Sequence, residues 1–159
     1  MTDDRWTDAD DALLAMHMLP TEHPVALTAA IWEALDDYEA NSGALSTWVT
    51  PECRDDWGDF STVSEALASQ ALALVGTARQ RAGEADIAFV WLIRKGAPAA
   101  PARMSQEDEA VIIGAIFTWV WRPELGGWRL HSVGGAMPEA DRLPRTSPNA
   151  APAIDFVEI

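Results

Sequence analysis

Two apolar segments, residues 111–122 and 128–133, constrain the fold more than any other part of the chain. The stretch TWVWRPELGGW joins them and places three tryptophans around a turn rich in Pro and Gly. Large and small residues alternate with a period of two on both sides of this turn. Such alternation around a short Gly-containing loop predicts a β-hairpin with one aromatic face.

Counting from the turn gives the register of this hairpin. If Arg122 pairs with Gly127 across a four-residue loop, the aromatic face follows directly. On that face Trp121 lies opposite Trp128, Trp119 opposite Leu130, and Phe117 opposite Ser132. The other face then carries Ile116, Thr118, Val120, Arg129, His131 and Val133. A slip of one residue would exchange the two faces.

The first half of the chain has helical periodicity instead. Apolar residues recur at helical spacing through residues 24–40, and Asn41-Ser42-Gly43 is typical of a helix end. Further helices are predicted at residues 7–19, at 44–49, after Thr50-Pro51, and from Ser61 or Thr62 to near Gly76. Strands are predicted at 86–95 and, on a weaker pattern, at 77–81, with a long loop at 96–109.

Helices followed by antiparallel strands predict an α+β fold, with the helices packed on one side of a curved antiparallel sheet. We expect one domain over residues 1–159. It comprises an N-terminal helical arm at 1–21, a core at 22–135 and an extended Pro-rich tail at 136–159 that ends in IDFVEI. The size fits a single hydrophobic core.

The net charge of −14 is distributed unevenly along the chain. Residues 1–60 hold 14 of the 25 acidic residues but only two of the 11 basic ones. Such a field repels phosphate backbones and anionic lipid, so we expect no nucleic-acid and no membrane partner. The acidic residues either solvate the outer helix faces or steer a basic partner or cationic ligand.

With a single cysteine, Cys53, and an acidic N-terminal segment, a cytoplasmic location is expected.

No residue pattern indicates a metal or a cofactor. His17, His23 and His131 lack metal-ligand spacing, and no Gly-rich phosphate loop occurs. Asp55, Asp56 and Asp59 offer oxygen ligands but are more typical of a solvated turn. Cys53 has acidic neighbours and no histidine near it in the sequence, which argues against a nucleophile.

The segments SGALSTWVTPEC, WGDFSTVSEALAS and FTWVWRPELGGWRLHSVGG, together with the helix at 24–40, resemble the nuclear-transport-factor-2-like superfamily. This superfamily includes the ketosteroid isomerases and the SnoaL-like polyketide cyclases, and the resemblance covers residues 22–135. It implies a cone-shaped fold whose helices and concave sheet face enclose an apolar pocket. The residues implied to line that pocket are Trp32, Trp48, Phe117, Trp119, Trp121 and Leu130. Plain core packing is the alternative for the same side chains.

The isomerase chemistry of that family does not carry over to this sequence. It needs a tyrosine and a neutral carboxylic acid as oxyanion donors, and a carboxylate base. Tyr38, the one tyrosine, sits late in its expected helix, and Phe117 or Trp119 occupies the position of the acid. Asp55, Asp59 and His131 are the weak candidates for proton transfer, with capping or structural roles as their alternatives.

Three functions remain open on this reasoning. The first is a non-enzymatic domain that binds an apolar small molecule or a protein partner. The second is a polyketide cyclase-, dehydratase- or isomerase-like enzyme that uses an Asp or His131 on a hydrophobic substrate. In the third, the segment IDFVEI adds as a strand to a partner, although packing on its own domain is favoured. A homodimer is expected through the outer sheet face, with Ile116, Thr118, Arg129 and His131 in the contact.

Overall fold

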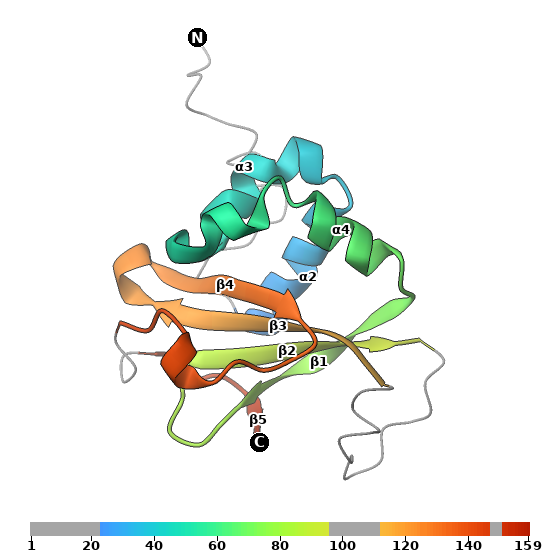
Figure 1. The fold of residues 1–159 in the computed structure, drawn as a ribbon. Helices are drawn as coiled ribbons and strands as arrows, with labels where there is room; N and C mark the ends of the chain where they lie inside the picture. The colour runs from blue at the N-terminus through green and yellow to red at the C-terminus, as the bar shows by residue number, and fades with distance from the viewer. Residues whose placement is uncertain (1–22, 96–111, 147–150) are drawn as a thin grey trace.

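The computed structural model describes residues 23–95, 112–146 and 151–159 (Figure 1). The predicted arm at 1–21, with its helix, and the loop predicted at 96–109 lie outside these residues. The described elements are α2 (Pro24–Leu35), α3 (Tyr38–Trp48), η1 (Pro51–Trp57), α4 (Ser61–Ala68), β1 (Leu72–Gln80), β2 (Ile87–Arg94), β3 (Ile113–Arg122), η2 (Pro123–Leu125), β4 (Gly127–Gly134), η3 (Ala140–Arg142) and β5 (Phe156–Glu158).

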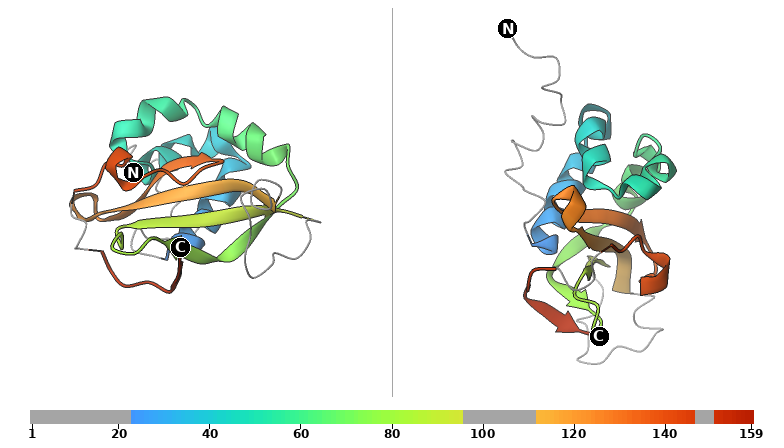
Figure 2. Two further views of the ribbon diagram at one scale, coloured as in Figure 1. Left: turned by 60° about the horizontal axis from the view of Figure 1, so that its bottom comes forward. Right: turned by 90° about the vertical axis from the view of Figure 1, so that its left-hand side faces the viewer.

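The sheet has the strand order β4-β3-β2-β1-β5. Strands β1 to β4 pair antiparallel, as predicted, whereas β5 pairs parallel with β1, so the sheet is mixed rather than fully antiparallel. Helices α2, α3 and α4 all lie on one face, which we call the inner face, and the C-terminal segment crosses the other, outer face (Figure 2). The predicted α+β class is confirmed.

The first helix is shorter than predicted. Helix α2 ends at Leu35, and α3 runs without interruption through Asn41-Ser42-Gly43, where we expected a stop. The side-chain amide of Asn41 donates to the carbonyl of Ala34 at 3.1 Å, so this residue satisfies the end of the preceding helix. Burial of the apolar residues in the second half of α3 outweighs the weak helix propensity of its first half.

Helix α4 also ends early, at Ala68, while the prediction continued it to Gly76. The side chains of Ser69 and Gln70 both donate to the carbonyl of Ala66 and complete the last turn. From Leu72 onward the chain pairs with β2 instead. The weakly predicted strand at 77–81 is therefore the second half of the longer strand β1.

The main core lies between the inner face and the helices. Its largest fully buried side chains are aromatic, and those of β3 and β4 are Phe117, Trp119 and Trp128. They pack against Leu27 and Ile31 of α2. These five side chains are at most 2 % exposed, and their burial stabilises the packing of helix on sheet.

The predicted hairpin register is correct for half of its length. Trp121 lies opposite Trp128 and Trp119 opposite Leu130, as counted from the turn. The register then shifts by one residue, so that Thr118 faces Ser132 and Phe117 faces Val133. His131 is the extra residue of this β-bulge, and Val133 moves to the inner face, where it packs against the core.

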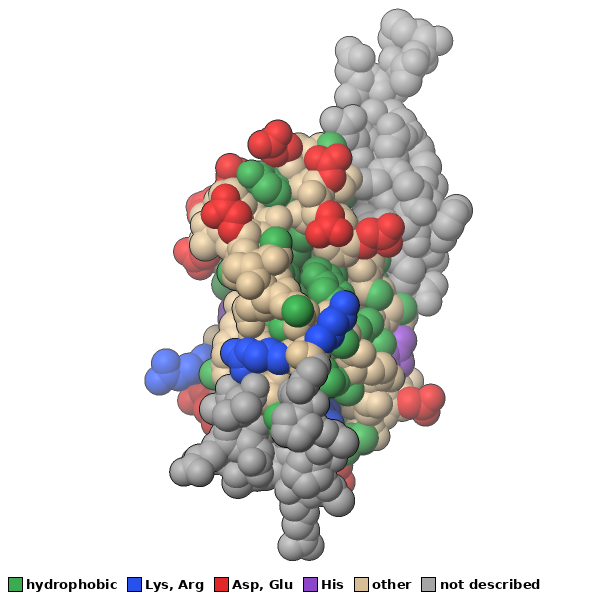
Figure 3. Space-filling model, turned by 90° about the vertical axis from the view of Figure 1, so that its right-hand side faces the viewer, with side chains coloured by type: hydrophobic (Ala, Val, Ile, Leu, Met, Phe, Trp, Pro, Cys, Tyr) green, Lys and Arg blue, Asp and Glu red, His purple; other side chains and the backbone are tan. Residues whose placement is uncertain are grey.

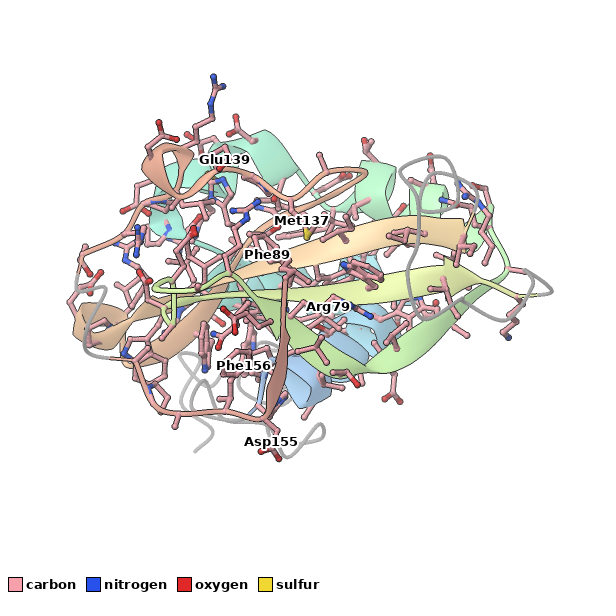
Figure 4. All side chains as sticks on the ribbon, turned by 90° about the horizontal axis from the view of Figure 1, so that it is seen from below. Arg79, Phe89, Met137, Glu139, Asp155 and Phe156 are labelled. Atoms are coloured by element: carbon pink, nitrogen blue, oxygen red, sulfur yellow. The ribbon has the colours of Figure 1, made fainter. Side chains whose placement is uncertain are left out.

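A second apolar layer covers the outer face. Residues 137–143 of the chain itself lie there: Leu143 is buried with Phe89 and Val120, and Met137 packs beside them (Figure 4). The guanidinium of Arg81 donates to the carbonyls of Met137 and Pro138 at 2.9 and 2.8 Å and fixes this segment.

This covering segment corrects the expected dimer surface. Thr118 and Ile116 are 0 % and 3 % exposed within a single chain. His131 bulges toward η1 rather than standing on an open outer face. A contact between two copies through Ile116 and Thr118 would therefore need the chain to uncover them first.

The last residues of the chain form an edge strand. Phe156, Val157 and Glu158 pair with Ala78, Arg79 and Gln80, so the favoured packing of the tail on its own domain is confirmed. A ring nitrogen of His23, Nε2, lies 3.0 Å from the carbonyl of Asp155, and Nδ1 accepts from the backbone of Val25 at the start of α2.

Candidate functional site

A cleft opens where η1 and α4 meet the ends of β3 and β4, and we call it the α4 cleft. Its volume is about 370 Å³, within the range of small-molecule sites. Figure 3 shows this end of the molecule, with acidic side chains over the helices and hydrophobic side chains between them and the sheet. The residues that line the cleft are Asp56, Trp57, Thr62, Val63, Ala66, Leu67, Gln70, Gly114, Ala115, Val133, Gly134 and Gly135.

Trp57, the aromatic residue that lines the cleft, packs against a buried phenylalanine. The ring of Trp57 stacks on Phe60, with centroids 5.7 Å apart and planes 25° from parallel. Phe60 is 2 % exposed and adopts a φ of +69°, which is unusual for a bulky residue. The burial of its ring keeps the backbone in this conformation, and that conformation turns the chain from η1 into α4.

The bulge of β4 shapes the floor of the cleft. It turns Val133 to the inner face, next to Ala115 of β3, and both residues line the cleft. Leu67 of α4, which is 4 % exposed, lines the cleft as well. The floor is therefore apolar, and among the described residues that line the cleft Asp56 is the charged side chain.

Four of the six residues predicted to line a pocket are buried in the core, and the other two, Trp32 and Trp121, are partly buried and pack against it. Trp48, Phe117, Trp119 and Leu130 are at most 2 % exposed and belong to the same buried hydrophobic cluster. Trp121 is half-buried and contacts Trp128 edge-to-face, with centroids 5.4 Å apart. Trp32 lines a separate groove on α2 with Glu33, Asp36 and Leu74.

The two aspartates predicted as candidates for proton transfer, Asp55 and Asp59, both lie outside the lining of the α4 cleft. Asp59 accepts from both the backbone and the hydroxyl of Ser61, at 3.0 and 2.6 Å, so it caps α4. These hydrogen bonds hold the pKa of Asp59 below its ordinary value. Asp55 is exposed and does not line the α4 cleft, whereas its neighbour Asp56 does.

Sequence reasoning missed one pair of residues that the fold brings together. Cys53 Sγ lies 3.4 Å from Nδ1 of His131, although 78 residues separate them in the chain. Both side chains are half-buried. The parallel bridge between Val49 and Leu130 sets η1 against the edge of β4, and the bulge turns His131 toward η1. A bulge that adds one residue has no sequence signal in this hairpin.

Ion pairs anchor η1 to the sheet beside this pair. The guanidinium of Arg122 donates to both carboxylate oxygens of Glu52, at 2.8 and 2.9 Å, and also bonds to Glu124. Its hydrogen bond lowers the pKa of Glu52. Burial lowers the pKa of His131, which favours the neutral imidazole, while Glu52 and Asp56 act in the opposite direction.

Within the described residues, no group of three or more His, Cys, Asp or Glu side chains is placed to hold a metal ion. Over the same part of the chain, none of the helices has the length and apolar character needed to cross a membrane. The chain matches no family model, and neither the curated proteins nor the solved structures contain a match to it.

Proposed function

We propose that the protein binds a small, mainly apolar molecule in the α4 cleft and carries out no reaction on it. The observation that carries the proposal is the cleft itself. It is a hollow of about 370 Å³, open to solvent, whose lining is more apolar than polar, with Trp57 on its wall and one carboxylate, that of Asp56, among the described residues that line it. The proposal retains the ligand-binding expectation but moves the site away from the buried tryptophans.

The chemistry of the lining defines the ligand class. Trp57, Val63 and Leu67 present apolar surface, which stabilises a bound molecule by about 25 cal/mol for each Å² removed from water. Thr62 and Gln70 offer hydrogen bonds, and Asp56 offers a negative charge. A ligand with an apolar body and a neutral or cationic polar end satisfies all three.

Native mass spectrometry of the protein as purified tests the proposal. An excess mass that disappears on denaturation, and that is absent from a variant whose cleft is filled by a larger side chain at Ala66, would support it. Retention of the same excess mass in the filled variant would place the ligand elsewhere and contradict the proposal. The mass of the released molecule would also narrow its chemical class.

The cone-shaped fold and the relationship to the nuclear-transport-factor-2-like superfamily are part of this proposal. Helices on one face of a curved sheet, with a cleft at one end of their interface, support them. The enzymatic alternative has less support, because Asp55, Asp59 and His131 do not line the α4 cleft. Only Asp56 remains near it as a carboxylate base, and alanine at Asp56 would abolish any turnover of this kind.

A second copy of the chain is the partner that the β5 edge favours. Within the described residues, the exposed large hydrophobic side chains are Phe156, Val157 and Ile159, at 48 %, 43 % and 44 %. The opposite edge, β4, is covered where Thr50 donates to the carbonyl of Leu130. We therefore propose that a homodimer, if it extends the sheet, pairs through β5. Light scattering would show a dimer that Val157→Lys converts to a monomer; a wild-type monomer would contradict this.

A further inference from the structure

We infer that Cys53 is a thiol activated by His131 and placed to add to soft carbon electrophiles of the α,β-unsaturated carbonyl class. The site lies on η1 and β4, outside the lining of the α4 cleft. The inference therefore does not depend on the proposed ligand, and the two can fail separately.

The geometry of the pair carries this inference. A distance of 3.4 Å between Cys53 Sγ and His131 Nδ1 is within hydrogen-bonding range for sulfur, with the donor set by the imidazole tautomer, and it joins a nucleophile to a base. His131 reaches the thiol because it is the bulged residue of β4, and bulges commonly re-aim a side chain in this way. Both residues are half-buried, so each keeps part of its surface in contact with solvent.

Two separate contacts fix the two sides of the pair relative to the sheet and to each other. On η1, the bidentate contact between Glu52 and Arg122 ties the residue before Cys53 to strand β3. On β4, Leu130 is held by the hydrogen bond from Thr50 to its carbonyl. The distance between sulfur and imidazole is thus set by backbone and ion-pair contacts on each side.

The charges around the pair act on the imidazole of His131. The carboxylates of Glu52, which is paired with Arg122, and of Asp56 both raise the pKa of His131 against the effect of burial. Arg129, on the same strand as His131, donates to backbone carbonyls of Leu125 and Trp128. When the neutral imidazole carries its proton on Nε2, the thiol donates to Nδ1, and the Nδ1 lone pair is placed to take the thiol proton.

The reaction balances without a further reagent. The sulfur of Cys53 forms a bond to the β-carbon of the electrophile as the carbon–carbon π bond breaks. His131 Nδ1 takes the thiol proton during the attack, and the same proton equivalent ends on the α-carbon. No leaving group, oxidant or reductant is needed, and the product is a stable thioether.

N-ethylmaleimide is the probe for the test. Since Cys53 is the only cysteine of the chain, the intact mass reports its addition without ambiguity. The second-order rate constant is measured at neutral pH for wild type and for His131→Asn. Asparagine keeps an acceptor oxygen near the position of Nδ1 but takes up no proton, so it separates a base from a merely structural contact. Circular dichroism and tryptophan fluorescence verify that the variant is folded.

We expect folded wild type to react at least about tenfold faster than His131→Asn, which is at the low end of general-base effects. The unfolded wild-type chain in denaturant gives a reference rate constant that needs no variant. The rate constant of Cys53 in the folded protein should exceed this reference, after correction for the effect of the denaturant on the reaction of a free thiol. Equal rates for wild type and His131→Asn would overturn the inference. A folded rate below the unfolded reference would overturn it as well.

Discussion

Trp119 donates a hydrogen bond from its indole Nε1 to the hydroxyl of Thr28 at 2.8 Å, and both side chains are completely buried. The hydroxyl in turn donates to the carbonyl of Pro24 at 2.8 Å. This chain of two bonds ties β3 to the first turn of α2. Other buried indoles of the described core, those of Trp48, Trp121 and Trp128, have no such partner there, so the Thr28 contact fixes one aromatic side chain of the layer in orientation.

Replacing Thr28 by Val keeps the shape of this side chain but removes the acceptor. The indole N–H of Trp119 then stays buried without a partner, and we expect the free energy of unfolding to fall by about 1–3 kcal/mol in urea titrations. Thr47→Val is the matched control: its hydroxyl bonds to the carbonyl of Ala44 within the same helix and is only partly buried. If Thr28→Val lowered the free energy of unfolding no more than Thr47→Val does, the stabilising role of the hydrogen bond between Trp119 and Thr28 would be contradicted.

The segment that covers the outer face depends on one buried ion pair. Arg145 donates to both carboxylate oxygens of Asp86 at 2.7 Å, and the side chain of Asp86 is 0 % exposed. Arg145→Met leaves that carboxylate buried and unpaired, and we expect a loss of about 3 kcal/mol of stability. The double variant Asp86→Asn with Arg145→Met should recover part of this lost stability, because it no longer buries an unpaired charge.

Arg142→Met provides the control for this pair, because Arg142 is exposed in the same segment. It should change the unfolding midpoint little. If Arg145→Met and Arg142→Met proved equally mild, Asp86 would have to be solvated in solution, and the segment would not be clamped as described.

The Glu52–Arg122 contact gives a pH dependence with a definite sign. The folded pKa of Glu52 lies below its ordinary value of 4.5, mainly because Arg122 donates to the carboxylate. The contact therefore stabilises the fold at neutral pH, and this stabilisation is lost as the pH falls from about 4.5 through the lower folded pKa.

We expect Glu52→Gln to be less stable than wild type at neutral pH by less than about 1 kcal/mol, since the Glu52 side chain is 49 % exposed and screened by solvent. The difference should shrink as the solution is acidified below the ordinary glutamate pKa. Urea midpoints of both proteins across this pH range measure it. A difference that grows on acidification would mean that the sign is wrong.

Asp56 should favour cationic ligands over neutral ones in the α4 cleft. We expect Asp56→Asn to weaken the binding of an apolar amine such as dodecylamine by about two- to fivefold at low salt, as for an exposed charge pair, and to leave a neutral dye unaffected. High salt should remove most of the effect. Asp55→Asn, one residue away and outside the cleft, is the control and should bind the amine as wild type does. Equal binding by both variants would exclude Asp56 as a recognition group.

The sequence was sufficient to predict β2, β3, β4 and the half of the hairpin nearest its turn, because alternation and loop length set the register from Arg122 to Trp119. It indicated only the second half of β1. It was not sufficient beyond the bulge at His131, since one extra residue in an apolar strand changes no local pattern. The helix ends failed for a related reason: Asn41 and Ser69 bond to the backbone of neighbouring turns, and only tertiary packing decides which turn they end.

The candidate site was harder to predict than the fold. The aromatic residues of β3 were correctly placed on the inner face, yet they fill the core, because side chains from α2 and α3 occupy the space that a pocket would need. The α4 cleft depends on Trp57, on the backbone turn at Phe60 and on Val133 after the bulge. The contact of Cys53 with His131 likewise needs elements that are distant in sequence, so no spacing rule reveals it.

Binding of the neutral dye Nile red to wild type, Ala66→Trp and Ala68→Trp tests the ligand site most directly. Both alanines are exposed on α4, but only Ala66 lines the cleft. We predict that wild type and Ala68→Trp bind the dye alike, whereas Ala66→Trp binds it at least about tenfold more weakly, because the added ring occupies the apolar volume. Equal affinity in all three proteins would show that the dye binds elsewhere and would contradict the assignment of the α4 cleft as the site.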